Sequence, residues 1–320
     1  MKVNFKKITS LLLIGILAIS VAACGKKIPD NAVAVVEDKV ITIEDYNKSF
    51  AMVEKSYNEI YGDTIWTQEI QGKTVKDMVK SQLLDTMVIE QLIIKNIKAT
   101  EFKIKDTEVN EGYAKFMEAV VKDDVTQKFY TDKGIDEVFI KSQITSQFYK
   151  EEFDRVIKSA LEKDQAKLDT LYKSYPIQIK ASHILVKDEA KAKELLKKIK
   201  AGGDFAKLAK ENSTDVASAK NGGSLGLFPR GVMVPEFEKA AFALKIGEVS
   251  EIIPSKFGFH IIKLDEIQTL DSLKAAGAKV EEIEVYKRTI LSNLTNDETK
   301  AKIEELKKNS KIQTFPDRIK

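Results

Sequence analysis

The fold is decided by two apolar stretches that each carry one histidine. Residues 179–186 read Ile-Lys-Ala-Ser-His-Ile-Leu-Val, and residues 257–264 read Phe-Gly-Phe-His-Ile-Ile-Lys-Leu. His183 and His260 are the only two histidines among 320 residues. Short runs rich in apolar and β-branched residues are typical of strands. If the two strands pair, both rings meet in one buried polar spot among apolar side chains, which is a common form of a binding or catalytic site.

The residues around these two strands predict a small α+β domain with an antiparallel sheet. Ala201-Gly202-Gly203 ends one predicted helix, as glycine often does, and Asp204 is placed to cap the next helix. Asn221-Gly222-Gly223-Ser224 predicts a tight turn. The predicted strands cover residues 178–186, 251–254 and 258–264, and the predicted helices cover residues 189–200, 205–210 and 234–244.

Helical patterns flank this domain on both sides. Across residues 45–174, and again after residue 269, apolar residues recur mostly at three- and four-residue steps. Tyr175-Pro176 is the predicted border, because proline disfavours helix at the residue before it. Residues 32–36 and 40–42 predict a short hairpin ahead of the first helix. We expect the two flanks to pack together, with their apolar stripes either forming core seams or leaving an exposed binding surface.

The first 23 residues have the order of a secretory signal: a basic end, a short apolar run and small residues before a cut site. Lys2, Lys6 and Lys7 supply the basic end, and they account for the whole formal net charge of +3. The remaining body is neutral, which argues against nucleic acid as a partner. The apolar run is shorter than the ~20 residues that a membrane span requires, so a transmembrane anchor is the weaker alternative.

Cys24 is the only cysteine, so no disulfide can form within the chain. It directly follows Val21-Ala22-Ala23, and Val-Ala-Ala-Cys resembles a bacterial lipobox, in which the cysteine is lipidated and becomes the new N-terminus. A plain signal peptide with an incidental cysteine is the alternative. The lipobox predicts anchoring by acyl chains, which is stable when two or more chains are attached.

The central domain resembles the parvulin-type peptidyl-prolyl isomerases. The layout of leader, helical region, parvulin domain and C-terminal helices is similar to that of the PrsA foldases of Gram-positive bacteria, which implies a lipid anchor at the outer face of the cytoplasmic membrane. The motifs that carry the resemblance are Ala181-Ser182-His183-Ile184-Leu185, Gly222-Gly223-Ser224-Leu225-Gly226, Met233-Val234-Pro235-Glu236-Phe237, Ala241-Phe242-Ala243-Leu244, Gly247-Glu248-Val249-Ser250 and Phe257-Gly258-Phe259-His260-Ile261-Ile262. The resemblance implies a signal peptide over residues 1–23, an N-terminal helical region over 24–175, a parvulin domain over 176–268, and a C-terminal helical region over 269–320 that packs with the N-terminal one.

The resemblance also implies a set of site residues. His183 and His260 are the paired histidines of the family, and they are explained equally well as core residues that hold the sheet together. The polar catalytic position falls on Asp215, or on Val216 in an ungapped alignment. Ser255 is a candidate second hydroxyl. Leu225, Met233 and Phe237 form the expected apolar slot for the substrate proline.

Neither a cofactor nor a metal is expected, because two histidines without a thiol make an incomplete ligand set. The resemblance implies no preference for phosphorylated substrates, because phosphate-directed parvulins carry a basic cluster just after the first histidine strand, whereas residues 187–190 here, Lys-Asp-Glu-Ala, carry mixed charge.

The predicted function is rotation of X-Pro peptide bonds in unfolded secreted proteins. Uncatalysed, such bonds isomerise in tens of seconds or longer, and an apolar slot favours the less polar twisted amide over the planar one. The alternative is a holdase, whose helical flanks bind unfolded chains without catalysis. A third reading is a structural dimerisation module, and the sequence leaves open whether the chain forms a homodimer.

Overall fold

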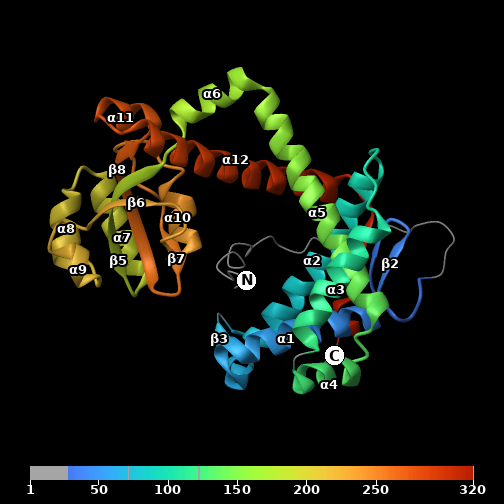
Figure 1. Ribbon diagram of the computed structural model, residues 1–320. Coiled ribbons are helices and arrows are strands. Elements are labelled where there is room, and N and C mark those ends of the chain that lie inside the picture. Colours follow the sequence, from blue (N-terminus) through green and yellow to red (C-terminus); the bar gives the residue numbers. More distant parts are fainter. Residues whose placement is uncertain (1–27, 71, 122, 320) are drawn as a thin grey trace. The chain divides into compact units, whose positions relative to one another are not determined.

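The computed structural model describes residues 28–70, 72–121 and 123–319 of the chain (Figure 1). The predicted signal peptide and Cys24 lie outside these residues. Among the described residues, no helix combines the length and apolar character needed to cross a bilayer.

The described part divides into two compact units. One unit spans residues 161–293, and the other combines residues 28–160 with residues 294–319. The helices are α1 (Ile43–Tyr61), α2 (Val75–Lys98), α3 (Asp106–Val120), α4 (Asp124–Asp132), α5 (Glu137–Lys163), α6 (Gln165–Ser174), α7 (Glu189–Lys200), α8 (Phe205–Asn212), α9 (Val216–Ala219), α10 (Pro235–Ala241), α11 (Leu270–Ala275) and α12 (Val280–Lys308), with 3-10 turns η2 (Asp63–Thr67) and η3 (Pro316–Arg318). The strands are β1 (Ala32–Val36), β2 (Lys39–Thr42), β3 (Glu69–Ile70), β4 (Lys73–Thr74), β5 (Gln178–Val186), β6 (Ser224–Pro229), β7 (Ile253–Ser255), β8 (Gly258–Gln268) and β9 (Ile312–Thr314).

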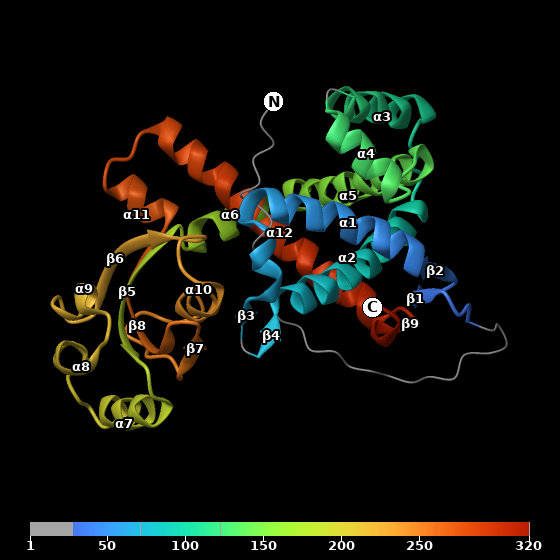
Figure 2. The same ribbon diagram turned by 90° about the horizontal axis from the view of Figure 1, so that it is seen from below.

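The unit that carries both histidines is built on a four-stranded antiparallel sheet in the order β6-β5-β8-β7. Side chains alternate across this sheet, as the strand period requires. Ile184 and Ile261 pack with α7 and α8 on one face, whereas Ala181, Ile262 and Leu264 pack with α10 on the other (Figure 2). The predicted α+β domain with an antiparallel sheet is confirmed.

The second unit is largely helical and has a small sheet in the order β2-β1-β9. The predicted hairpin is β1 and β2, and Thr42 caps α1 by accepting a hydrogen bond from the Asp45 backbone N–H at 3.1 Å. Leu306, near the end of α12, packs in the same core as Trp66 of the N-terminal part. The expected packing of the two helical flanks against each other is therefore confirmed.

Several element boundaries differ from the prediction. The helix expected over 234–244 covers only Pro235–Ala241, because Ala243 and Leu244 donate to carbonyls three residues back and so tighten into 3-10-like turns. The strand expected over 258–264 continues to Gln268 along β5. The strand expected over 251–254 is Ile253–Ser255, and the helix expected over 205–210 continues to Asn212.

Several short elements were not predicted, among them the β3–β4 hairpin, α9 and β9. Each is short, and β9 forms only because β1 offers it a partner 276 or more residues earlier in the chain.

Candidate active site

The two histidines meet on the α10 face of the sheet. In the β5–β8 register Leu185 lies opposite His260 and His183 opposite Ile262, so the two histidines are diagonal neighbours on adjacent strands. Their Nδ1 atoms are 3.2 Å apart and their ring centroids 5.4 Å apart. The rings are 5% and 4% exposed. The structure thus brings both histidines into one buried polar spot.

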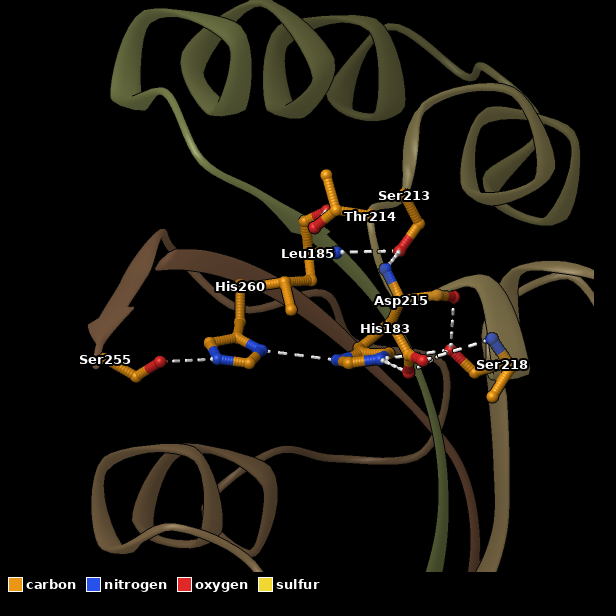
Figure 3. Close-up of polar contacts among 9 residues, drawn as sticks. His183, Leu185, Ser213, Thr214, Asp215, Ser218, Ser255 and His260 are labelled. Carbon is orange, nitrogen blue, oxygen red and sulfur yellow. Dashed lines mark hydrogen bonds and ion pairs between the residues drawn. The ribbon is translucent and has the colours of Figure 1, made fainter. Parts of the chain in front are cut away.

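A line of hydrogen bonds joins Ser255, His260, His183 and Asp215, which we call the histidine network (Figure 3). Ser255 Oγ lies 2.8 Å from His260 Nε2, and His183 Nε2 lies 2.7 Å from Asp215 Oδ2. Ser255 comes from β7, the histidines from β8 and β5, and Asp215 from the residue before α9. The four residues of the histidine network therefore come from four separate segments of the chain.

The chemistry of its members sets the direction of this network. An ionised carboxylate only accepts hydrogen bonds, so the His183 Nε2 that faces Asp215 carries a hydrogen. The Nδ1 atoms of the two rings face each other, and His260 Nε2 faces the Ser255 hydroxyl. The Ser255 hydroxyl also donates to the Gly258 carbonyl at 3.3 Å, and its oxygen accepts the Phe257 backbone N–H at 3.0 Å.

Asp215 is held in place by its own helix and by Ser218. It caps α9 by accepting from the Ala217 backbone N–H at 3.2 Å. The Ser218 hydroxyl donates to Asp215 Oδ2 at 2.6 Å, and its oxygen lies 3.1 Å from His183 Nε2. Val216, the alternative for the polar position, is 64% exposed, so Asp215 is the residue that reaches His183.

The loop before Asp215 is tied to the histidine strand. Ser213 Oγ accepts the backbone N–H of Leu185 at 3.1 Å, and the Thr214 backbone N–H donates to the Leu185 carbonyl at 2.7 Å. These contacts, among residues drawn in Figure 3, fix the position of Asp215 beside β5.

The charges of the network are set by burial and by its hydrogen bonds. Burial, followed by the nearby charge of His183, lowers the pKa of His260 to about 4 from its ordinary 6.5. Burial by itself raises the pKa of Asp215, but the hydrogen bonds from Ser218 and His183 outweigh it and leave that pKa below its ordinary 3.8. At neutral pH the network therefore combines a neutral His260 ring with an ionised carboxylate.

Leu225, Met233 and Phe237, the three residues of the predicted slot, pack in one apolar cluster, which we call the cup, beside the network. Phe237 is 2% exposed, and its ring centroid is 5.6 Å from that of His183 and 5.3 Å from that of His260, edge-on in both cases. Leu225 and Met233 are partly buried and pack in the same core cluster as Phe237. The structure thus brings together all three residues of the predicted slot.

Two glycines allow the backbone to close around the histidine strands. A Cβ at Gly223 would lie 2.3 Å from the His183 carbonyl oxygen, and one at Gly258 would lie 2.4 Å from the Val186 carbonyl oxygen. Both glycines have positive φ, 87° and 129°, which other residues rarely adopt. Gly223 is therefore required by packing against β5, whereas a Cβ at Gly222 would lie 2.7 Å from Ala206 Cβ of α8.

Sequence reasoning missed Ser213 and Ser218, whose roles depend on distances across the fold. Short Ser-x-Asp and Asp-x-x-Ser spacings are common at helix caps and give no signal specific to a site. Within the described ranges, no group of three or more His, Cys, Asp or Glu side chains is arranged to hold a metal ion.

Comparison with known proteins agrees with this geometry. A family model described as a PPIC-type PPIASE domain matches residues 167–268, and one described as a SurA-like N-terminal domain matches residues 2–137. The foldase protein PrsA of Caldanaerobacter subterraneus subsp. tengcongensis is 35% identical over 327 residues, which cover 98% of this chain and 98% of that protein. The chain belongs to the PrsA foldase family.

The similarity extends to a second relative and to a solved structure. The foldase protein PrsA of Clostridium botulinum is 31% identical over 334 residues, covering 97% of each chain. A crystal structure of peptidylprolyl isomerase (PrsA) from Bacillus anthracis has 32% sequence identity, covers 71% of this chain and 96% of that chain, and has a TM-score of 0.41. The PrsA family and the PPIC-type domain confirm the expected parvulin-type isomerase and foldase activity. As a foldase, the protein acts on other protein chains.

Proposed function

We propose that this PrsA family member isomerises X-Pro bonds of unfolded secreted proteins at the outer face of the cytoplasmic membrane, with the apolar cup and the histidine network as its active site. The observation that carries this proposal is the contact of Phe237 with both histidine rings. It joins an apolar surface that suits a pyrrolidine ring to a fixed line of polar groups.

The cup favours the twisted amide because that state is less polar than the planar one. A planar peptide bond resists rotation by ~18–20 kcal/mol because of resonance, and resonance is lost in the twisted state. Leu225, Met233 and Phe237 hold the proline ring and exclude water, which favours the less polar twisted amide. Each ~1.4 kcal/mol of such preference accelerates rotation tenfold.

The histidine network supplies a fixed charge without covalent chemistry. The ionised Asp215 places negative charge beside the cup, and a negative charge near the substrate carbonyl oxygen destabilises the planar amide, whose oxygen carries the larger partial charge. His183 and His260 position Asp215 and Ser255 at the two ends of the network. The Ser255 oxygen, which presents lone pairs, accepts a backbone N–H of the substrate.

The proposed organisation places this site in a tethered molecule. The signal peptide covers residues 1–23, and lipidated Cys24 anchors the mature chain. The isomerase domain covers residues 176–268 and is flanked by helical regions over 24–175 and 269–320, of which residues 28–160 and 294–319 form one compact unit. Metabolic labelling with a palmitate analogue tests the anchor, since Cys24→Ser should abolish incorporation.

Met233→Ala tests the catalytic proposal. Met233 lines the cup and is only partly buried, so its truncation leaves the fold in place. We expect kcat/KM in a proline-limited refolding assay to fall about tenfold, equivalent to ~1.4 kcal/mol of lost preference for the twisted amide. Ile246→Ala is the matched control, because Ile246 is 63% exposed in the same unit and lies outside the cup. Equal losses in the two variants, or no acceleration by the parent chain, would contradict the proposal.

Holdase activity is a second candidate, favoured by a hollow in the helical unit. A cavity of about 650 Å³ lies between α1 and the turn before α5, and its lining combines apolar with charged side chains, among them Phe50, Lys48 and Glu54. Such a mixed surface suits an unfolded chain. If a chain lacking residues 176–268 suppresses client aggregation as well as the full chain does, the flanks are sufficient for that activity.

A further inference from the structure

Exposed apolar side chains gather around the candidate site. Val216 and Phe257 are 64% and 48% exposed, and they lie within two residues of Asp215 and Ser255. In Figure 3 Asp215 and Ser255 stand at opposite ends of the histidine network, and Val216 and Phe257 follow these two residues in the chain by one and two positions. Leu227 and Val232 are also exposed, and they lie within two residues of the cup residues Leu225 and Met233. Apolar side chains that collect in water at the edge of a site indicate a surface that a partner covers.

Phe257 is held rigidly although its ring faces water. Its backbone N–H donates to Ser255 Oγ at 3.0 Å, and its carbonyl accepts from Lys187 Nζ at 2.8 Å. The next residue, Gly258, is pressed against the Val186 carbonyl too closely for any Cβ. The turn is thus fastened both to the histidine network and to the end of β5. These contacts fix the backbone that carries the ring, and an apolar surface on a fixed backbone binds with less loss of conformational entropy than one on a mobile loop.

We propose that Phe257 is the binding subsite for an apolar or aromatic client side chain next to the proline, and that Val216 extends the same apolar rim at the other end of the network. This inference rests on the proposed function, since it takes the proline to occupy the cup. Successive client Cα atoms are ~3.8 Å apart, so a residue beside the proline stays within reach of the rim. Apolar residues beside proline are exposed in unfolded chains and buried in folded ones, and the subsite therefore selects unfolded clients.

A set of Ala-Xaa-Pro-Phe peptides with Xaa as Phe, Leu, Ala or Glu tests the subsite on the full chain. We expect the parent chain to prefer Phe and Leu over Ala by about fivefold in kcat/KM, equivalent to ~1 kcal/mol. Phe257→Ala should remove this preference and leave turnover of the Ala peptide within about twofold, a change of less than ~0.5 kcal/mol. Ile246→Ala is the matched control, because Ile246 is 63% exposed in the same unit and lies outside the rim.

Binding of the Phe and Ala peptides, followed by NMR shift changes, separates the subsite from catalysis. If the parent chain turns over no peptide, the proposed function fails, while weaker binding of the Phe peptide alone by Phe257→Ala still supports the subsite. If Phe257→Ala weakens binding of both peptides equally or of neither, the subsite is wrong. A preference for Glu would also overturn it and would point instead to Lys187 and to Lys256, whose Nζ lies 5.2 Å from the centre of the Phe257 ring.

Discussion

Acidification should weaken the isomerase unit through His260. This ring has a pKa of about 4 in the folded chain and an ordinary value of 6.5. Between these two pH values His260 is protonated in the unfolded chain and neutral in the folded chain, so the free energy of unfolding falls as pH drops from 6.5 to 4. The stabilisation is complete above pH 6.5, and the difference amounts to about 3 kcal/mol lost by pH 4. Asp215, whose pKa lies below 3.8, adds a further loss only at still lower pH.

The composition of the chain offers a direct assay. Two histidines give two imidazole C2–H signals in a proton NMR spectrum, and their pH titration reports both rings. Denaturant unfolding followed by the same signals at pH 7, 6, 5 and 4 gives the free energy of the isomerase unit. Trp66, the single tryptophan, belongs to the helical unit, so its fluorescence provides an internal control for that unit. Titration of His260 near 6.5, or a free energy that does not depend on pH in this window, would refute the reasoning.

Three further substitutions test separate parts of the account. Gly223→Ala should destabilise the isomerase unit by ~3 kcal/mol or more, because its Cβ meets the His183 carbonyl oxygen. Gly226→Ala, with φ of 70° and open space around its Cβ, should cost less stability in the same unfolding assay. Equal losses would show that the positive φ, and not the contact, decides the cost. Ser218→Ala should raise the pKa of Asp215 towards its ordinary value, since it removes a hydrogen bond to the carboxylate; an unchanged carboxyl titration in carbon NMR would remove Ser218 from the network. Leu306→Ala should lower the stability reported by Trp66 fluorescence by ~2 kcal/mol, and no change would show that the C-terminal helix does not contribute to the N-terminal core.

Most of the isomerase unit was predictable because its signals are local. The strand containing His183 and the helix over residues 189–200 have the predicted bounds, since an apolar run in one case and a capped amphipathic stretch in the other determine them. The pairing of the two histidine strands followed from the resemblance and from the rarity of histidine in the chain.

What the sequence could not provide depends on contacts between distant segments. Strand β9 exists because β1 has a free edge, and its own three residues carry no strand signal that is distinct from a loop. The choice between Asp215 and Val216 depends on how the loop is tied to Leu185, a contact across 29 residues. The role of Ser218 can be recognised only from the folded structure, which places His183 beside it.

The central claim is tested most directly by exchange NMR on an Ala-Phe-Pro-Phe peptide with a catalytic amount of the intact chain. We expect cis and trans signals, which interconvert in tens of seconds or longer without catalyst, to exchange at least about a hundredfold faster, equivalent to ~3 kcal/mol. Met233→Ala should lose most of this acceleration. Exchange at the uncatalysed rate, recorded while both histidine signals show the native unit, would contradict the account.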